Sequence, residues 1–208
     1  MDGNCGAHCK IEVRENGEFG FLAIVFMRFL SVALFLCSSA VPVLAQKFGP
    51  MENLAPPIPT PQIVVEKMLT AGHVKPGETV YDLGSGDGRI VITAAQKFGA
   101  KAVGVEILPE MCDKARERVK ELGLQDRVSI VQGSALRVDL SPADVVTMYF
   151  LTSSNERLRP SLEHWLKPGA RVVSNEFQIK GWKSVETVRV KDGSMEHTIY
   201  VYEIGHTK

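Results

Sequence analysis

The residues with the clearest chemical meaning lie near the middle of the chain. Gly84, Gly86 and Gly88 are spaced two apart, Asp82 stands two positions before them, and Glu106 follows 18 residues after the last glycine. An apolar run leads into the glycines and a helical pattern leads out, which predicts a strand, a tight turn and a helix N-terminus. Glycine permits backbone conformations closed to other residues and lets a ligand approach N–H groups at the positive end of a helix. The loop is therefore predicted to bind a small polar molecule.

The spacing of the glycines separates this loop from the dinucleotide-binding fingerprint, Gly-x-Gly-x-x-Gly. The chain has Gly-x-Gly-x-Gly instead, preceded by Asp82. Glu106 falls at the end of the next predicted strand, where a carboxylate can accept hydrogen bonds from both hydroxyls of a ribose. The loop and the two acids together are stronger evidence for a nucleoside site than the glycines alone.

Strands and helices alternate regularly around the loop. Hydrophobic period and Gly/Pro punctuation predict strands at about 79–83, 102–106, 128–131, 144–150 and 171–174, helices at about 87–98, 109–122 and 155–166, and a terminal hairpin from 184–190 and 197–204. This order predicts an α/β fold with a doubly wound, Rossmann-like sheet of seven strands, mostly parallel and closed by a C-terminal antiparallel hairpin. Ligands bind such sheets beyond the carboxyl ends of the strands, where the glycine loop lies.

Two segments precede the predicted folded domain at 62–208. Residues 1–46 are predicted to be a leader: a signal peptide starting at Met27, which would make 1–26 an upstream mis-start, or an uncleaved membrane anchor. The protein is accordingly expected to be exported to the periplasm or held at a membrane, and to be cytoplasmic if the leader does not function. Residues 47–61 carry five prolines, which disfavour helix and strand, and end in Thr60-Pro61, typical of an N-cap and first helical position. This segment is predicted to dock on the domain.

Composition narrows the possible functions. Lysine plus arginine (24) equals aspartate plus glutamate (24), so the basic excess typical of nucleic-acid-binding proteins is missing and a nucleic-acid partner is not expected. The domain holds one cysteine, Cys112, because the other three precede it. Cys5 to Cys9 looks like half of a metal site without a second half, and no metal site is expected.

With these motifs in place, the chain resembles the class I S-adenosylmethionine-dependent methyltransferases over about residues 55–204. Their first motif is matched by Asp82-Leu-Gly-Ser-Gly-Asp-Gly88. The proline segment at 57–61 and the helix that follows it resemble, more narrowly, the protein-lysine methyltransferases related to the ATP synthase c-subunit enzyme. The resemblance implies S-adenosyl-L-methionine as cofactor and a protein substrate with an accessible lysine.

The resemblance also implies roles for the cofactor-binding residues. The loop from 84 to 88, Ser85 included, would carry the methionine part of the cofactor, Asp82 its amino group and Glu106 its ribose. Ile107 would flank the adenine. Relatives commonly have an aspartate after the third strand to meet the adenine amine; Ser134 stands there in this chain, so that contact is expected from Ser134 or from backbone.

Methyl transfer is an in-line displacement at a sulfonium carbon, so the protein mainly positions the nucleophile and excludes water. A lysine acceptor must first lose its proton. Tyr149 at the end of the fourth strand and Glu176 after the fifth are the candidate catalytic helpers, Thr60 is a candidate lid residue, and Trp182 is a candidate substrate platform. For each of these four, packing or solvation is the simpler explanation.

Two alternatives stay open from the sequence. One is a small-molecule or RNA methyltransferase. The other is an exported, non-catalytic nucleoside-binding domain, suggested by the predicted leader, because S-adenosylmethionine is made in the cytoplasm.

Overall fold

The computed structural model describes residues 53–207, so the predicted leader at 1–46 lies outside the described residues and stays a prediction. The elements in chain order are α2 (Gln62–Ala71), β1 (Thr79–Leu83), α3 (Arg89–Phe98), β2 (Lys101–Glu106), α4 (Pro109–Glu121), β3 (Val128–Gln132), β4 (Val145–Met148), α5 (Thr152–Trp165), β5 (Arg171–Asn175), β6 (Glu186–Asp192) and β7 (Met195–Glu203). Within 53–207, no helix is both long enough and apolar enough to cross a bilayer.

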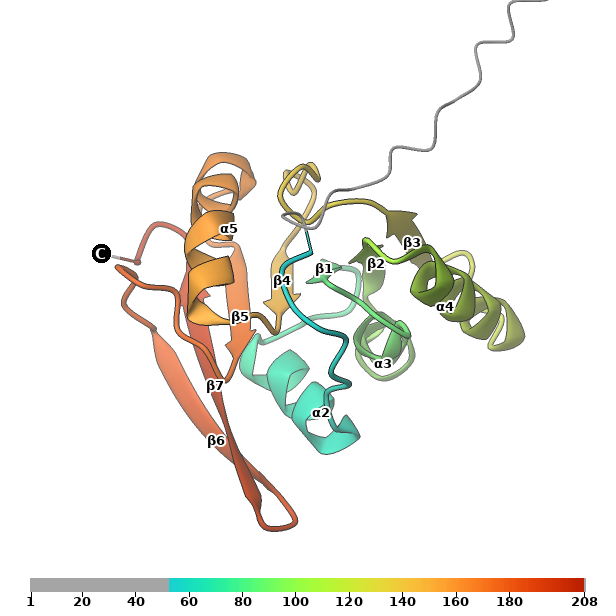
Figure 1. Ribbon diagram of the computed structural model, residues 1–208, viewed down its shortest axis with the longest axis horizontal. Helices are drawn as coiled ribbons and strands as arrows, with labels where there is room; N and C mark the ends of the chain where they lie inside the picture. The colour runs from blue at the N-terminus through green and yellow to red at the C-terminus, as the bar shows by residue number, and fades with distance from the viewer. Residues whose placement is uncertain (1–52, 208) are drawn as a thin grey trace, which may run out of the picture. The chain divides into compact units, whose positions relative to one another are not determined.

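One seven-stranded sheet organises these residues, in the order β3-β2-β1-β4-β5-β7-β6 (Figure 1). The first five strands pair in parallel, and β7 lies antiparallel between β5 and β6. The chain moves from β1 outward to β3, then returns to the other side of β1 as β4. This reversal creates a topological switch point at the carboxyl ends of β1 and β4, where such folds bind ligands. The predicted fold class is confirmed.

Two apolar layers cover the sheet. Helices α2, α3 and α4 pack on one face, through side chains such as Val64, Val91 and Val119. Helix α5 packs on the other face, through Leu158 and Leu162. Figure 1 shows α5 apart from the other three helices, with strands between them. Because strand residues alternate between faces, each strand position belongs to either the α2/α3/α4 face or the α5 face.

The fourth strand and the helix after it differ from the predicted ranges. The strand predicted at 144–150 ends at Met148, because the chain turns away from the sheet at its carboxyl edge. The helix predicted to begin at about 155 begins at Thr152, because the carbonyl of Leu151 accepts hydrogen bonds from the N–H groups of Ser154 and Asn155 and closes an earlier turn.

Two apolar side chains that end the predicted helices at 109–122 and 155–166, or lie next to their ends, are partly exposed. Leu122 is 43% exposed because it is the C-cap residue of α4, beyond the last turn that packs on the sheet. Trp165 is 37% exposed at the last position of α5, where its ring meets His164 edge-on. Both side chains lie at helix ends, where a periodic pattern does not show where packing stops.

Candidate active site

The glycine loop follows β1 at the switch point, and two of its glycines are required by the geometry. Gly84 has φ +74°, and a Cβ there would come within 2.9 Å of ring carbon Cζ of Phe150. Gly88 has φ +77° and precedes α3, where a Cβ would lie 3.2 Å from Cβ of Ala115. A side chain at either position would thus meet both backbone strain and a packed neighbour.

Four N–H groups of the loop form hydrogen bonds within the domain. Those of Gly84 and Ser85 donate to the carbonyl of Val105, and that of Gly88 donates to the carbonyl of Ser85. The N–H of Gly86 donates to Oε2 of Glu106 at 2.8 Å. These four N–H groups have protein acceptors, so the predicted contact between the loop and a ligand stays a prediction for the rest of the loop. The loop instead contributes open space where side chains are missing.

Glu106 holds the loop to the end of β2. Besides the bond from Gly86, its Oε1 accepts hydrogen bonds from the N–H groups of Ile107 at 2.8 Å and Leu108 at 2.9 Å. A carboxylate has about four acceptor positions, and these three bonds leave about one for a ligand. Accepting both hydroxyls of a ribose would therefore require one backbone bond to lengthen or break.

Asp82 is buried beneath the loop, on the α2/α3/α4 face. The hydroxyl of Thr147 donates to its Oδ1 at 2.7 Å. Burial raises the pKa of the Asp82 carboxyl to about 7, the hydrogen bond from Thr147 opposes this rise, and the negative charges of Glu106 and Asp87 add to it. A cation placed beside this carboxyl would reverse the effect of burial.

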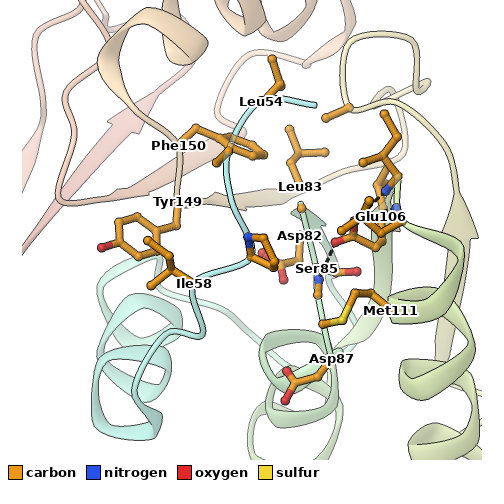
Figure 2. A pocket seen from close by; sticks show the side chains of 18 of the residues that line it. Leu54, Ile58, Asp82, Leu83, Ser85, Asp87, Glu106, Met111, Tyr149 and Phe150 are labelled. Carbon is orange, nitrogen blue, oxygen red and sulfur yellow. Dashed lines mark hydrogen bonds between the residues drawn. The ribbon is translucent and has the colours of Figure 1, made fainter. Parts of the chain in front are cut away.

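Residues 53–61, here called the proline strap, cross the carboxyl edge of the sheet above the loop. At one end Leu54 is buried, and its carbonyl accepts a hydrogen bond from Oγ of Ser154 at 2.6 Å. At the other end the carbonyl of Thr60 accepts one from Nη1 of Arg89 at 2.8 Å. Figure 2 shows the strap running from Leu54 to Ile58 beside the glycine loop. Both ends are thus fixed by side chains of the domain.

The role predicted for Thr60 at the helix start is wrong. Helix α2 begins at Gln62, and no side chain within 53–207 caps its N-terminus. The N–H groups of Val64 and Val65 bond to the carbonyl of Pro61 instead. Thr60 is buried, and the backbone carbonyl is the group that anchors the strap. Arg89, which binds it, is held by two hydrogen bonds to Asp87.

A cavity of about 430 Å³ lies between the strap, the glycine loop and the ends of β2 and β4 (Figure 2). The structure brings eight of the predicted site residues to its wall: Thr60, Asp82, Gly84, Ser85, Gly86, Glu106, Ile107 and Tyr149. Gly88 and Ser134 do not line it, although Gly133 and Ala135 do. The Ser134 hydroxyl accepts a weak hydrogen bond from the N–H of Leu136 at 3.3 Å.

Sequence reasoning missed part of this wall. Leu54, Ile58, Met111, Lys114 and Phe150 also line the cavity. Lys114 lies one turn after Met111 on α4, and this spacing after Pro109 is the one signal that could have placed both beside Glu106. The strap residues have no comparable signal, because a proline-rich segment does not specify where it docks.

The remaining two predicted residues lie elsewhere. Glu176 and Trp182 line a second cavity of about 470 Å³, formed by residues after β5 together with Thr152 and Tyr200. The indole N–H of Trp182 donates to Glu163 at 2.9 Å. The rings of Tyr149 and Phe177 are stacked with centroids 6.2 Å apart. Since Tyr149 lines the first cavity and Phe177 the second, this ring pair lies between the two.

The fold and this site define the class of protein. A switch-point cavity over a glycine loop, flanked by Asp82 and Glu106, is the arrangement of a Rossmann-like class I methyltransferase. The comparisons with known proteins agree. Residues 82–186 match the family described as the ANTKMT methyltransferase domain, and the chain belongs to that family. The predicted methyltransferase class is confirmed.

Three similar proteins show how far the likeness extends. A protein-lysine N-methyltransferase of Saccharolobus islandicus is 52% identical over 154 residues, which are 74% of this chain and 96% of that protein. The adenine nucleotide translocase lysine N-methyltransferase of Mus musculus is 32% identical over 67% of this chain and 59% of its own length. The solved structure of an RNA methyltransferase from Salinibacter ruber, with bound S-adenosyl-L-homocysteine, is 46% identical, has a TM-score of 0.67, and is matched over 71% of this chain and 94% of that chain.

Proposed function

We propose that this protein transfers a methyl group from S-adenosyl-L-methionine to the side-chain amine of a lysine in a protein. The observation that carries the proposal is the 52% identity to a protein-lysine N-methyltransferase across 96% of that protein's length. A likeness of that extent includes the acceptor side of the fold as well as the cofactor side.

The cavity fits this cofactor in size and charge. Its volume of about 430 Å³ lies within the range of small-molecule sites, roughly 300–1,000 Å³. Two of its buried side chains are the carboxyls of Asp82 and Glu106, which suits a ligand that carries an ammonium group and a sulfonium. An adenine and a methyl group need an apolar surface that excludes water. The apolar strap supplies it together with Leu83, Met111 and Phe150.

Individual residues take roles that follow from these contacts. S-adenosyl-L-methionine supplies a methyl group on a positively charged sulfur. The Asp82 carboxylate would hold the amino group of its methionine part, and Glu106 would accept a hydrogen bond from its ribose. Ile107 would flank the adenine, with Ser134 near that end of the site. The proline strap would exclude water from the reacting atoms, because it covers the carboxyl edge and is fixed at both ends.

The charge of the protein favours a lysine acceptor over an RNA acceptor. An RNA acceptor requires a positively charged surface that neutralises phosphates, whereas this chain carries equal numbers of acidic and basic residues. Glu176, an acid, lies beyond Tyr149 on the side of the site away from the glycine loop. A carboxylate there repels a polyanion and attracts an ammonium. The similarity to an RNA methyltransferase makes RNA the alternative that the experiment must separate.

The test is labelled-methyl transfer into a cell extract with tritiated S-adenosyl-L-methionine. Parallel samples are treated with protease or ribonuclease, and the labelled protein is hydrolysed to identify the methylated amino acid. The matched pair of variants is Glu106→Gln, in the cavity, and Glu117→Gln, an exposed acid of α4. We expect label in mono-, di- or trimethyl-lysine with wild type and with Glu117→Gln, and strongly reduced label with Glu106→Gln.

Label that survives protease but is released by ribonuclease would contradict the lysine assignment and favour RNA. Label in a small solute would favour a small-molecule acceptor. Failure of the purified protein to bind S-adenosyl-L-methionine in isothermal titration would contradict the enzyme assignment itself.

A further inference from the structure

A group of polar side chains lies at the carboxyl end of β5 and on the adjoining part of β7, next to Tyr149. We call Asn175, Glu176 and His197 the β5-end cluster. Asn175 is the last residue of β5 and pairs with Ile199 of β7. Since Met148 pairs with Ser174, Tyr149 and Asn175 are the next positions along β4 and β5. The cluster therefore adjoins the residue that lines the cofactor cavity on this side.

The cluster lies on the same face of the sheet as Asp82. On β5, Val173 packs in the core beneath α2 and α3, and alternation puts Asn175 on that face. Thr147 pairs with Val173 and bonds to Asp82, so it also belongs to that face. Polar side chains thus lie on one face of the sheet at β1, β4, β5 and β7. They connect the cofactor side of the site with the β5-end cluster.

Asn175 lacks the partners that a buried amide normally has. Its exposure is 0%, and neither Oδ1 nor Nδ2 has a hydrogen-bond partner among the described residues. The nearby Asn155 is also fully buried, but its Nδ2 donates to the carbonyls of Phe177 and Gln178. Native proteins pair most buried polar atoms, and an amide with both ends unpaired costs stability. Asn175 lines neither of the two cavities described above, so an amine would reach its amide only after a neighbouring side chain moves.

Glu176 is held in an unusual backbone conformation beside this amide. Its φ is +62°, in the left-handed region that non-glycine residues rarely occupy. Its N–H donates to the carbonyl of Thr198 at 2.7 Å, which fixes the backbone. Its Oε1 lies 2.6 Å from Nδ1 of the buried His197, although the ring is not aligned to donate along this line. The N–H of Thr198 on β7 donates a long hydrogen bond of 3.5 Å to Oε2 of Glu176.

The negative charge of Glu176 affects the pKa of Tyr149. Burial raises the pKa of the Tyr149 hydroxyl, and the negative charge of Glu176 raises it further. Tyr149 therefore stays protonated and can donate or accept a hydrogen bond but carries no charge. Negative charge on this side of the cavity comes from Glu176, which also lines the second cavity.

We propose that the β5-end cluster is the subsite for the acceptor amine, an inference that rests on the proposed function. The Glu176 carboxylate attracts the ammonium group, the ammonium releases one proton to water, and Oδ1 of Asn175 accepts an N–H bond from the resulting neutral amine. An amine held in this way would keep its lone pair free of Asn175, and S-adenosyl-L-methionine would supply the methyl group that it accepts. His197 is a positioning residue, because its ring lies 2.6 Å from Oε1 of Glu176 and limits where the carboxylate can lie. The substrate class is a primary alkyl ammonium, as in a lysine side chain, reaching Tyr149 past Phe177.

The decisive variant is Asn175→Leu, because the two possible roles of Asn175 predict opposite results. If Asn175 serves the fold, its replacement lowers the melting temperature. If it serves the acceptor, removal of an unpaired buried amide leaves the melting temperature unchanged or higher, while activity falls. We expect the second result, with kcat/KM for methylation of extract protein reduced at least about 30-fold and the Kd for S-adenosyl-L-homocysteine within about twofold of wild type.

Glu176→Gln tests the charge independently of folding. We expect a rise in the apparent KM for extract protein of about tenfold or more, with a smaller change in kcat, because attraction of the ammonium precedes the chemical step. His197→Gln should raise KM less. The matched control is Glu196→Gln, which removes the neighbouring exposed acid of β7, 3.8 Å from Arg189, and should leave both constants unchanged.

A small probe tests the substrate class. n-Butylammonium should compete with extract protein in wild type, n-butanol should not, and Glu176→Gln should abolish the competition. Wild-type kcat/KM in both Asn175→Leu and Glu176→Gln would overturn the inference, and so would a lowered melting temperature in Asn175→Leu together with normal KM in Glu176→Gln. All of these tests require that the wild-type protein methylates lysine. If the wild-type protein does not, the proposed function is wrong and the subsite is not what failed.

Discussion

Replacing Asp82 by asparagine should make the cofactor-free protein more resistant to unfolding at high pH while weakening its hold on the cofactor. The two side chains have nearly the same shape, and the amide oxygen of the substituted side chain would keep the hydrogen bond from Thr147. The substitution therefore removes the charge and little else. Its effect depends on pH because the carboxyl of Asp82 has a pKa raised by burial to about 7.

The magnitude follows from linkage. In the unfolded chain the carboxyl ionises near its ordinary value of 3.8, and in the folded protein near 7. Between these values the folded state binds more protons than the unfolded state, so the free energy of unfolding falls as pH rises from about 4 to about 7. At about 1.4 kcal/mol per pKa unit, the loss totals about 4 kcal/mol at pH 8, and more than half of it falls between pH 5 and pH 8.

Asp82→Asn should abolish this slope. The new amide N–H group is buried, which costs about 1–3 kcal/mol if it finds no acceptor, but that cost is the same at every pH. Urea unfolding of the cofactor-free protein at pH 5 and pH 8 measures the difference, and Asp126→Asn, an exposed aspartate, is the matched control. The variant's stability relative to wild type should rise by about 2–3 kcal/mol between the two pH values.

Cofactor binding gives the second half of the prediction. In wild type the affinity for S-adenosyl-L-methionine should increase as pH rises toward 7, because the ionised carboxylate is the form that binds an ammonium. At pH 8 the variant should bind about 10- to 100-fold more weakly, the usual range for a lost charge-assisted hydrogen bond. If wild type and variant show parallel stability curves from pH 5 to pH 8, Asp82 ionises at an ordinary pKa and the reasoning about its burial is wrong.

Three further substitutions test the surroundings of the cavity. Gly84→Ala should cost about 1–3 kcal/mol in urea unfolding and impair cofactor binding, because the residue has φ +74° and the added Cβ meets Phe150 at 2.9 Å; unchanged stability would mean that the loop relaxes freely. Arg89→Met removes the hydrogen bond to the carbonyl of Thr60 and should speed hydrogen exchange in α2 and the strap while weakening cofactor binding several-fold in calorimetry. Ser154→Ala removes the hydrogen bond at the strap's other end and should lower the free energy of unfolding by about 0.5–1.5 kcal/mol. Unchanged stability would mean that water replaces this bond without loss.

The order of elements could be predicted because the signals for it are local. Hydrophobic period and the glycines and prolines between periodic segments recur along the chain, and a parallel sheet with crossover helices has few possible topologies. Element ends were less predictable. Whether β4 ends at Met148 or continues to Phe150 depends on where the neighbouring strands end, and a single strand does not contain that information.

The cofactor side of the site was predictable for the same reason. Asp82, the glycines and Glu106 occupy fixed positions relative to two adjacent strand ends, so their spacing in sequence determines their spacing in the fold. The strap is different, because its contacts with Ser154 and Arg89 join segments far apart in sequence. Its docking was expected from its helix start, but the contacts that achieve it use backbone carbonyls, which no side-chain pattern reveals.

Asn175 could not have been singled out from the sequence. An asparagine at a strand end usually bonds to a turn or to water, and only the structure shows that this one is fully buried with neither amide atom paired among the described residues. One signal was nevertheless present. Thr147 and Asn175 occupy same-face positions on or just beyond adjacent predicted strands, both polar next to otherwise apolar runs. Two polar residues on the same face of neighbouring central strands indicate that both belong to one functional site.

Several features that lower stability meet at this edge of the sheet. Asp82 has a carboxyl that burial makes costly to ionise, Asn175 has an amide with no partner in the part of the chain that the structure describes, and Glu176 has a left-handed backbone. A fold selected only for stability would replace each of them, with asparagine, leucine and glycine respectively. All three lie at carboxyl ends of strands, and Asp82 and Asn175 share one face. Because each would gain a partner from a bound cation or amine, their common location is best explained by a reaction that brings a cationic cofactor to one end and an ammonium to the other.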